Sequence, residues 1–137
     1  MTILVAYAPF EESRAALDEA IRLAHLSHED LVVVNATPGG DHKHDAAVDE
    51  TEAERLQQVL DASGLRTEFR QFARGRSTVE EIRDVAAELD PSLVVVGIRR
   101  RGSFGKFLMG SVTDDVLKEI DQPVLCVKEP LKGARRD

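Results

Sequence analysis

The segment from Pro91 to Thr113 has the residue types of an anion-binding site. It contains no aspartate or glutamate, although the chain of 137 residues has 25 of them. It combines basic residues with glycines: Arg99, Arg100, Arg101, Lys106, Gly97, Gly102, Gly105 and Gly110. Glycines let backbone N–H groups come close to an anion, and arginine and lysine attract it. This composition predicts a loop that binds phosphate.

The position of this segment favours the same chemistry. It follows the apolar run 93–96, a predicted strand, and ends where a helix is expected from about 112 to 120. The N-terminus of a helix offers free N–H groups and a positive dipole end, and Ser111 adds a hydroxyl. Ligands of parallel α/β sheets bind at the carboxyl ends of strands. The alternative is a solvated basic loop whose glycines only turn the chain.

Two common phosphate motifs are absent. A P-loop needs glycine, four residues, then Gly-Lys-Ser/Thr. Gly105-Lys106 is present, but Arg100 occupies the position of the first glycine and Phe107 follows the lysine. The dinucleotide fingerprint Gly-x-Gly-x-x-Gly is missing after the first predicted strand, where the chain reads Tyr7–Phe10. Any phosphate site must therefore be of another kind.

Other reactive residues give no second site. His42, His44 and Asp45 could ligate a metal, but no further histidine or cysteine cluster accompanies them, so no metal site is predicted. Ser13 has no evident histidine or aspartate partner, and no catalytic base can be named. Cys126 is the one cysteine, and its apolar neighbours indicate a core residue.

The elements that must position the loop alternate between strand and helix. Short apolar runs predict four strands, at 3–7, 31–36, 93–96 and 124–127, and the alternating polar and apolar residues of 66–73 predict a fifth, half-buried strand nearer the sheet edge. Helical spacing predicts four helices, at 11–27, about 47–62, from the N-cap Ser77 to about 89, and about 112–120. This order is typical of an α/β fold, with a doubly wound five-stranded parallel sheet and helices on both faces. We expect one domain over 1–128 and a flexible tail over 129–137.

Composition limits the partners. The net charge of −7 gives no general attraction to nucleic acid or to anionic membranes. No apolar stretch is long enough to span a membrane. The N-terminal apolar run has no basic region before it, so it is interpreted as a strand and not as a signal peptide. We therefore expect a cytoplasmic protein.

Several segments together resemble the universal stress protein family over nearly the whole chain. Ile3–Ala6 and Glu11–Leu17 are similar to its opening. Leu93–Gly97 and Gly110–Val112, joined by twelve residues, are similar to its nucleotide loop, and Gln122–Val127 to its closing strand. The resemblance implies a Rossmann-like fold of the adenine nucleotide alpha hydrolase type, and usually a homodimer.

The resemblance also implies an adenine nucleotide, ATP or AMP, with Mg²⁺ bound only through it. Gly97, Gly110 and Ser111 match the family's glycine loop, whereas Arg100 replaces its middle glycine. Ala8 replaces the aspartate that usually ends the first strand. The positions expected to contact the nucleotide are Ala6, Ala8, Ala36, Val96, Gly97, Arg99, Arg100, Gly110, Ser111 and Val112.

The sequence thus predicts a regulatory stress-response protein that binds an adenine nucleotide and acts on an unidentified protein partner. One alternative is a dimeric scaffold of the same fold that binds no nucleotide. A further alternative is a slow nucleotide hydrolase, although the sequence offers no catalytic residues for it. We expect a homodimer through the last strand, because Val124, Leu125, Cys126 and Val127 are apolar and an edge strand with such side chains needs a cover.

Overall fold

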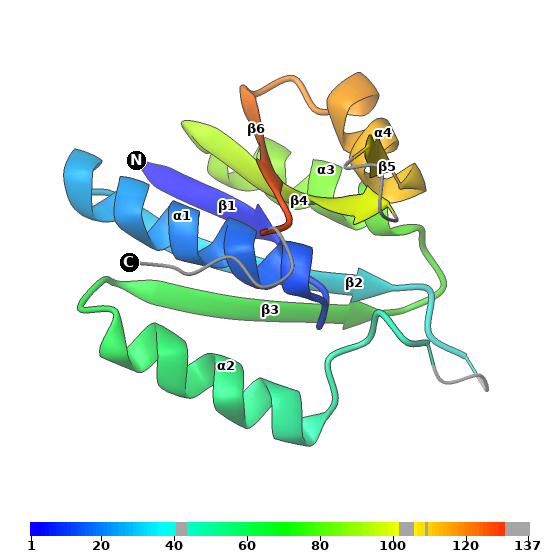
Figure 1. Cartoon of the computed structure of the whole chain (residues 1–137), viewed down its shortest axis with the longest axis horizontal. Coiled ribbons are helices and arrows are strands. Elements are labelled where there is room, and N and C mark those ends of the chain that lie inside the picture. The colour runs from blue at the N-terminus through cyan, green and yellow to red at the C-terminus, as the bar shows by residue number, and fades with distance from the viewer. Residues whose placement is uncertain (41–43, 102–105, 109, 131–137) are drawn as a thin grey trace.

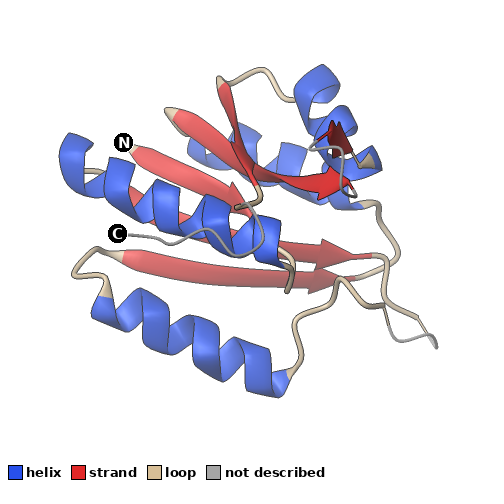
Figure 2. Ribbon diagram, viewed as in Figure 1, coloured by secondary structure: helices blue, strands red, loops and turns tan. Residues whose placement is uncertain are grey.

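The computed structural model describes residues 1–40, 44–101, 106–108 and 110–130, and at 100, 101 and 106–108 it describes the backbone only. Within these ranges strands and helices alternate along most of the chain (Figure 1, Figure 2). The strands are β1 (Thr2–Ala6), β2 (Asp30–Thr37), β3 (Thr67–Ala73), β4 (Leu93–Arg101), β5 (Lys106–Leu108) and β6 (Val124–Lys128). The helices are α1 (Glu11–Ser27), α2 (Glu50–Ala62), α3 (Thr78–Leu89) and α4 (Ser111–Glu119).

Five strands form a parallel sheet in the order β3-β2-β1-β4-β6. In the central strand, Ile3 pairs with Leu31 of β2 on one side and with Leu93 of β4 on the other. The sheet therefore grows outward from β1 in both directions, and the strand order reverses between β1 and β4. The predicted doubly wound parallel sheet is confirmed.

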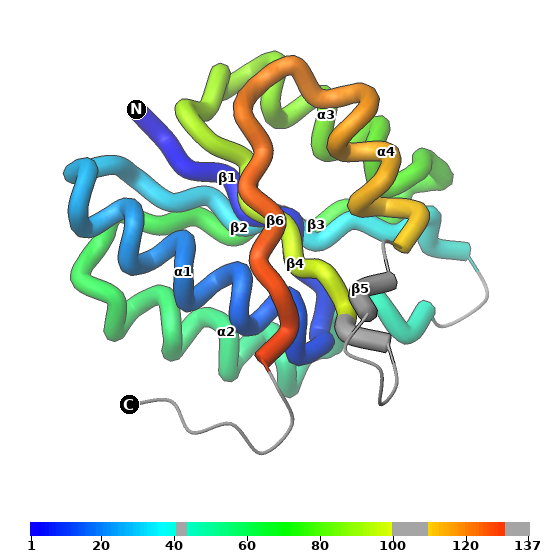
Figure 3. Tube along the Cα trace, turned by 45° about the horizontal axis from the view of Figure 1, so that its top comes forward, coloured from blue at the N-terminus to red at the C-terminus, as the bar shows by residue number. Residues whose placement is uncertain are grey.

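Helices cover both faces of the sheet (Figure 3). Successive strand residues point to opposite faces, so the buried runs supply two cores at once. On one face α1 and α2 pack on the strands, with the buried residues Ile3, Val5, Leu31, Val33, Val95, Ala16, Leu17, Ala20, Leu56 and Leu60. On the other face lie α3 and α4, with Leu4, Val32, Val34, Ala36, Val94, Val96, Ile82, Val85, Ala86, Val116 and Ile120.

Local capping fixes where two helices begin. At the start of α3, Ser77 Oγ accepts a hydrogen bond from Glu80 N (3.2 Å), and Glu80 Oε1 accepts one from Ser77 N (3.0 Å). This is the capping box that the sequence predicts. The helix α2 starts at Glu50, later than the predicted residue 47, because Asp49 is its N-cap and accepts a hydrogen bond from Glu52 N (2.8 Å).

The two edge strands differ in character. In β3, Arg70 pairs with Glu68 (2.8 Å) and with Glu88 of α3 (2.9 Å), so charged groups line this edge. The alternating pattern of 66–73 predicts such an edge strand correctly. In β6, the apolar residues 124–127 are only half-buried. Cys126 is accordingly not the fully buried core residue that its neighbours indicate, although partial burial raises the pKa of its thiol.

The segment between β4 and α4 contains a strand where a loop is expected. β4 continues past the predicted end at residue 96, and Arg99 pairs with Leu108 of β5 in antiparallel register. A run of three residues carries no periodicity of its own, so the sequence gives no signal for it.

None of the helices in the described ranges is both long and apolar enough to cross a bilayer. Residues 131–137 of the predicted tail lie outside the described residues.

Candidate functional site

A cavity of about 280 Å³ lies at the carboxyl ends of β1, β2 and β4. The first turns of α1, α3 and α4 complete its walls. It occupies the point at which the strand order reverses, where parallel α/β sheets bind their ligands. Its volume is close to the lower end of the range for small-molecule pockets, about 300 Å³.

Most of the predicted contact residues line this one cavity. They are Ala6, Ala8, Ala36, Val96, Gly97, Arg99, Gly110, Ser111 and Val112. Arg100 is the remaining predicted position, and its side chain lies outside the description. The fold therefore brings together residues from four separate segments of the chain.

One side of the cavity is apolar. Ala6, Val34, Ala36 and Val96 come from three neighbouring strands, and Ile82 comes from α3. The hydroxyl of Thr78 donates to Ala36 O (2.7 Å), which ties the start of α3 to the end of β2. Small and branched aliphatic side chains make a smooth wall that can hold a flat heterocycle.

Another part of the wall is the N-terminus of α4. Gly110 is its N-cap, with φ −68° and no side-chain cap, and the first helical hydrogen bond runs from Asp114 N to Gly110 O (3.0 Å). The N–H groups of residues 111–113 precede that bond and so have no partner within the helix. A helix N-terminus with unpartnered N–H groups is the kind of position at which proteins bind anions. Thr113 Oγ1 donates to Gly97 O (3.2 Å) and anchors the helix to β4.

Gly97 lines the cavity, but its lack of a side chain serves a different contact. A Cβ at this position would lie 2.2 Å from Glu12 O. The glycine thus lets the first turn of α1 press against the end of β4. The absence of a side chain at this position is therefore needed for helix–strand packing, whether or not a ligand also approaches it.

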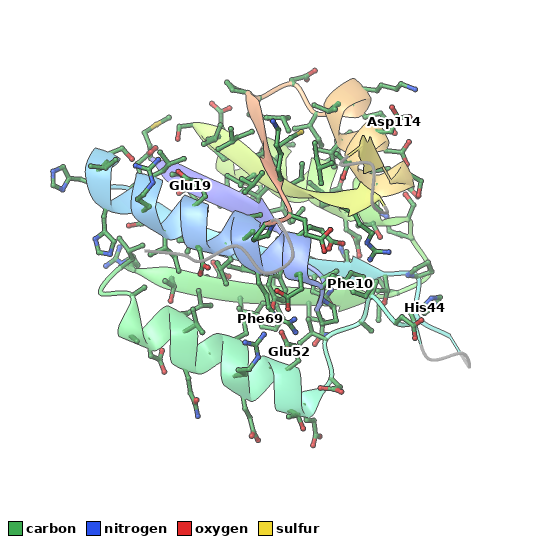
Figure 4. The ribbon with its side chains drawn as sticks, viewed as in Figure 1. Phe10, Glu19, His44, Glu52, Phe69 and Asp114 are labelled. Atoms are coloured by element: carbon green, nitrogen blue, oxygen red, sulfur yellow. The ribbon has the colours of Figure 1, made fainter. Side chains whose placement is uncertain are left out.

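Arg99 does not stand free in the cavity. Its Nε and Nη2 donate to Glu12 Oε1 at 3.3 and 3.1 Å. Its guanidinium lies over the ring of Phe10, 5.1 Å from the centroid, and Figure 4 shows Phe10 at the start of α1. Because Glu12 neutralises Arg99, this pair brings no net charge to the site.

A buried amide fixes the wall formed by the loop after β2. Asn35 is 1% exposed, and its Nδ2 donates to Tyr7 O (2.9 Å) and to Ala46 O (2.7 Å). Its Oδ1 accepts from Val48 N (2.9 Å) and from Gln71 Nε2 (3.1 Å). The amide thus uses its full hydrogen-bonding capacity to hold Ala46 at the cavity.

Tyr7 lies in the cavity wall, but its hydroxyl is turned to α2. The hydroxyl donates to Glu52 Oε1 (2.5 Å), and Arg55 donates to the same carboxylate from Nη2 (2.8 Å; Figure 4 labels Glu52). Burial, with the hydrogen bond to Glu52, raises the pKa of Tyr7 to about 12. The hydrogen bonds from Arg55 lower the pKa of Glu52 to about 2. This group is structural and presents no reactive hydroxyl to the cavity.

Several wall residues are not among the predicted contact positions: Tyr7, Phe10, Glu12, Ser13, Asn35, Ala46, Thr78 and Thr113. Ser13 accepts a hydrogen bond from Ala8 N (3.1 Å) and shapes the turn after β1. Glu12 and Ser13 belong to a helix whose spacing indicates only a core-facing surface. The sequence does offer one signal for these two residues. The helix that contains them begins soon after the end of β1, and ligand contacts usually lie near strand ends.

The residues that could ligate a metal are His42, His44 and Asp45. No group of three potential metal ligands occurs within residues that the structure describes. His44 Nε2 lies 3.0 Å from Gly39 O, on the loop after β2 (Figure 4), and His42 is outside the described residues.

Comparison with known proteins agrees with this geometry. The profile of the Universal stress protein family matches residues 1–128. A universal stress protein of Mycolicibacterium smegmatis is 35% identical over 126 residues, 92% of this chain and 96% of that protein.

Solved structures share the fold. The universal stress protein from Archaeoglobus fulgidus has a TM-score of 0.73 and 28% identity, over 93% of this chain and 98% of that one. A universal stress protein from the same organism, in complex with dAMP, has a TM-score of 0.67 and 24% identity, also over 93% and 98%. The chain described here belongs to the universal stress protein family.

Proposed function

We propose that this chain is a regulatory stress-response protein that binds an adenine nucleotide, AMP or ATP, in the cavity between β1 and β4. The observation that carries the proposal is the meeting of two unlike surfaces in one cavity. The cavity is lined both by apolar strand ends and by a helix N-terminus that has no side-chain cap. A nucleotide has the same two parts, a flat base and an anionic phosphate.

The cavity suggests an orientation for the ligand. The base lies against Ala6, Ala36 and Val96, where it gains from leaving water. The phosphate nearest the sugar lies at Gly110 and Ser111, where N–H groups are free to donate. The dAMP complex of the Archaeoglobus fulgidus protein belongs to the same ligand class, although the proposal for this chain rests on its own cavity.

Calorimetry tests the proposal. Titration of AMP and of ATP into the purified full chain is expected to show one site per chain, and acid extraction of fresh protein is expected to release adenine nucleotide. Absence of both heat and thermal shift at millimolar ligand would overturn the proposal and favour the alternative of a scaffold that binds no nucleotide.

We also propose that two copies pair through β6. Among the described strands, β6 has β4 as its single neighbour, and its apolar residues 124–127 are half-buried. An apolar edge with unpaired backbone groups risks aggregation unless it is covered. Antiparallel pairing with a second copy about a two-fold axis covers it. Pro123 precedes the strand and leaves its hydrogen-bonding ladder intact.

A further inference from the structure

Glu12 places a carboxylate in the wall of the cavity that also holds the N-terminus of α4, where the phosphate is proposed to bind. Its side chain is 12% exposed, and it belongs to the first turn of α1. Its backbone is fixed, because the carbonyl of Glu12 touches Gly97 at the end of β4. A carboxylate repels phosphate, so any direct contact of Glu12 with a nucleotide is expected to be with a group other than the phosphate.

The two oxygens of this carboxylate differ in their partners. Arg99 donates to Oε1 from both Nε and Nη2, and the stacking of its guanidinium on Phe10 holds it in place. No described residue donates to Oε2. An ionised carboxylate can accept about four hydrogen bonds, so Glu12 keeps an acceptor available for a ligand. Arg99 also offsets the negative charge that Glu12 would present to a nucleotide.

The position of Glu12 relative to α4 identifies the ligand group. The Glu12 backbone lies so close to Gly97 that a Cβ there would be 2.2 Å from Glu12 O, and the carbonyl of Gly97 accepts a hydrogen bond from Thr113 of α4. Glu12 is therefore a neighbour of the proposed phosphate site, and in a nucleotide the group next to the phosphate is the sugar. In dinucleotide-binding folds, an acidic side chain accepts hydrogen bonds from the ribose hydroxyls.

We propose that Glu12 Oε2 accepts hydrogen bonds from the ribose 2′- and 3′-hydroxyls and makes the site selective for ribonucleotides. This inference rests on the proposed nucleotide binding. It places the acceptor for the sugar hydroxyls on α1. Ala8, which follows β1, has no polar side chain that could accept a hydrogen bond from them. A deoxyribose would leave Oε2 desolvated and without a donor, which is the basis of the selectivity.

Comparison of sugar analogues tests the inference without any substitution. AMP, 2′-deoxyAMP and 2′,3′-dideoxyAMP share base and phosphate, so calorimetry isolates the contribution of the hydroxyls. We expect the wild-type chain to bind AMP at least about 10-fold more tightly than 2′,3′-dideoxyAMP, because a hydrogen bond to a charged group is lost.

Substitution of Glu12 tests whether this residue is the origin of the discrimination. Glu12→Ala is expected to lower the affinity for AMP to that for 2′,3′-dideoxyAMP, with the latter affinity not reduced. Glu12→Gln keeps the side-chain size and replaces the alanine variant in the test if that variant folds poorly. It is expected to show reduced discrimination between AMP and 2′,3′-dideoxyAMP. Glu11→Gln is the matched control, because Glu11 lies in the same helical turn with a 70% exposed side chain and pairs with Arg14.

The outcomes separate the two proposals. Equal affinities of the wild-type chain for AMP and 2′,3′-dideoxyAMP would overturn the role of Glu12 and leave nucleotide binding standing. Undiminished discrimination in both Glu12 variants would do the same. If none of the three nucleotides binds, the proposed function fails and the inference fails with it.

Discussion

Replacing Gly110 with aspartate places a negative charge at the N-terminus of α4 without disturbing the protein around it. The N-cap φ of −68° is accessible to any residue, and a Cβ built here meets nothing within 4 Å. Aspartate is also a preferred N-cap residue, so the free energy of unfolding is expected to equal or exceed that of the wild type by a few tenths of a kcal/mol.

The same substitution is expected to weaken nucleotide binding strongly. A carboxylate about 4–8 Å from a phosphate charge costs about 2–4 kcal/mol at an effective dielectric constant of about 20. That corresponds to a loss of affinity of roughly 30- to 1,000-fold. Calorimetry with AMP measures the loss, and thermal unfolding verifies that the variant is folded.

Gly110→Asn is the matched control, because asparagine caps the helix and has the same shape without the charge. It is expected to bind AMP more weakly than the wild type but clearly better than the aspartate variant. If aspartate leaves the affinity unchanged, the anion is not at this helix terminus. If both variants lose binding equally, the added side chain and not its charge blocks the site, and the electrostatic reasoning is refuted.

Four further predictions concern the fold. Gly97→Ala is expected to lower the free energy of unfolding in urea by about 1–3 kcal/mol, because its Cβ would lie 2.2 Å from a carbonyl oxygen of α1; unchanged stability would contradict the close packing. Asn35→Asp sets a carboxylate against the two carbonyls to which the amide now donates. Nucleotide affinity and thermal stability are therefore expected to fall at pH 7. Both are expected to recover in part at a pH low enough to protonate the new side chain. The pKa of Glu52 in the folded protein is lowered to about 2. Its contribution to stability is therefore fully present above the ordinary pKa of 4.5 and is lost as the pH falls toward 2. Glu52→Gln is expected to remove that part of the pH dependence of the free energy of unfolding. Leu125→Lys is expected to give a monomer or insoluble protein, and light scattering of the wild type at the mass of one 15.1 kDa chain would count against the β6 interface.

The sequence predicts the large elements because each has a local signal. The buried run of β4 starts with four consecutive aliphatic residues, and the Ser77/Glu80 capping box is visible in the chain as serine followed by glutamate three residues later. β5 has no such signal, since its three residues become a strand only by pairing with the extension of β4. The predicted start of α2 is displaced because the N-cap Asp49, and not the helical spacing of apolar residues, sets where the helix begins.

The candidate site is predictable where it follows strand ends and is not where it depends on packing. Ala6, Ala36 and Val96 end apolar runs, and parallel strands bring their carboxyl ends to one edge. Glu12 and Asn35 were not identified. Glu12 reaches the cavity because α1 packs closely on β4. Asn35 is a residue of β2, and the sequence does not show that its amide binds a distant loop.

The unlike edges of the sheet limit how many chains can join. A sheet with two apolar edges would add a copy at each end and grow into a continuous ribbon. Here the β3 edge carries Arg70 with its acidic partners Glu68 and Glu88, which disfavour a further strand. In the proposed dimer the two β6 edges meet and the two charged β3 edges face outward, so assembly closes at two chains and the joined ten-stranded layer stays soluble.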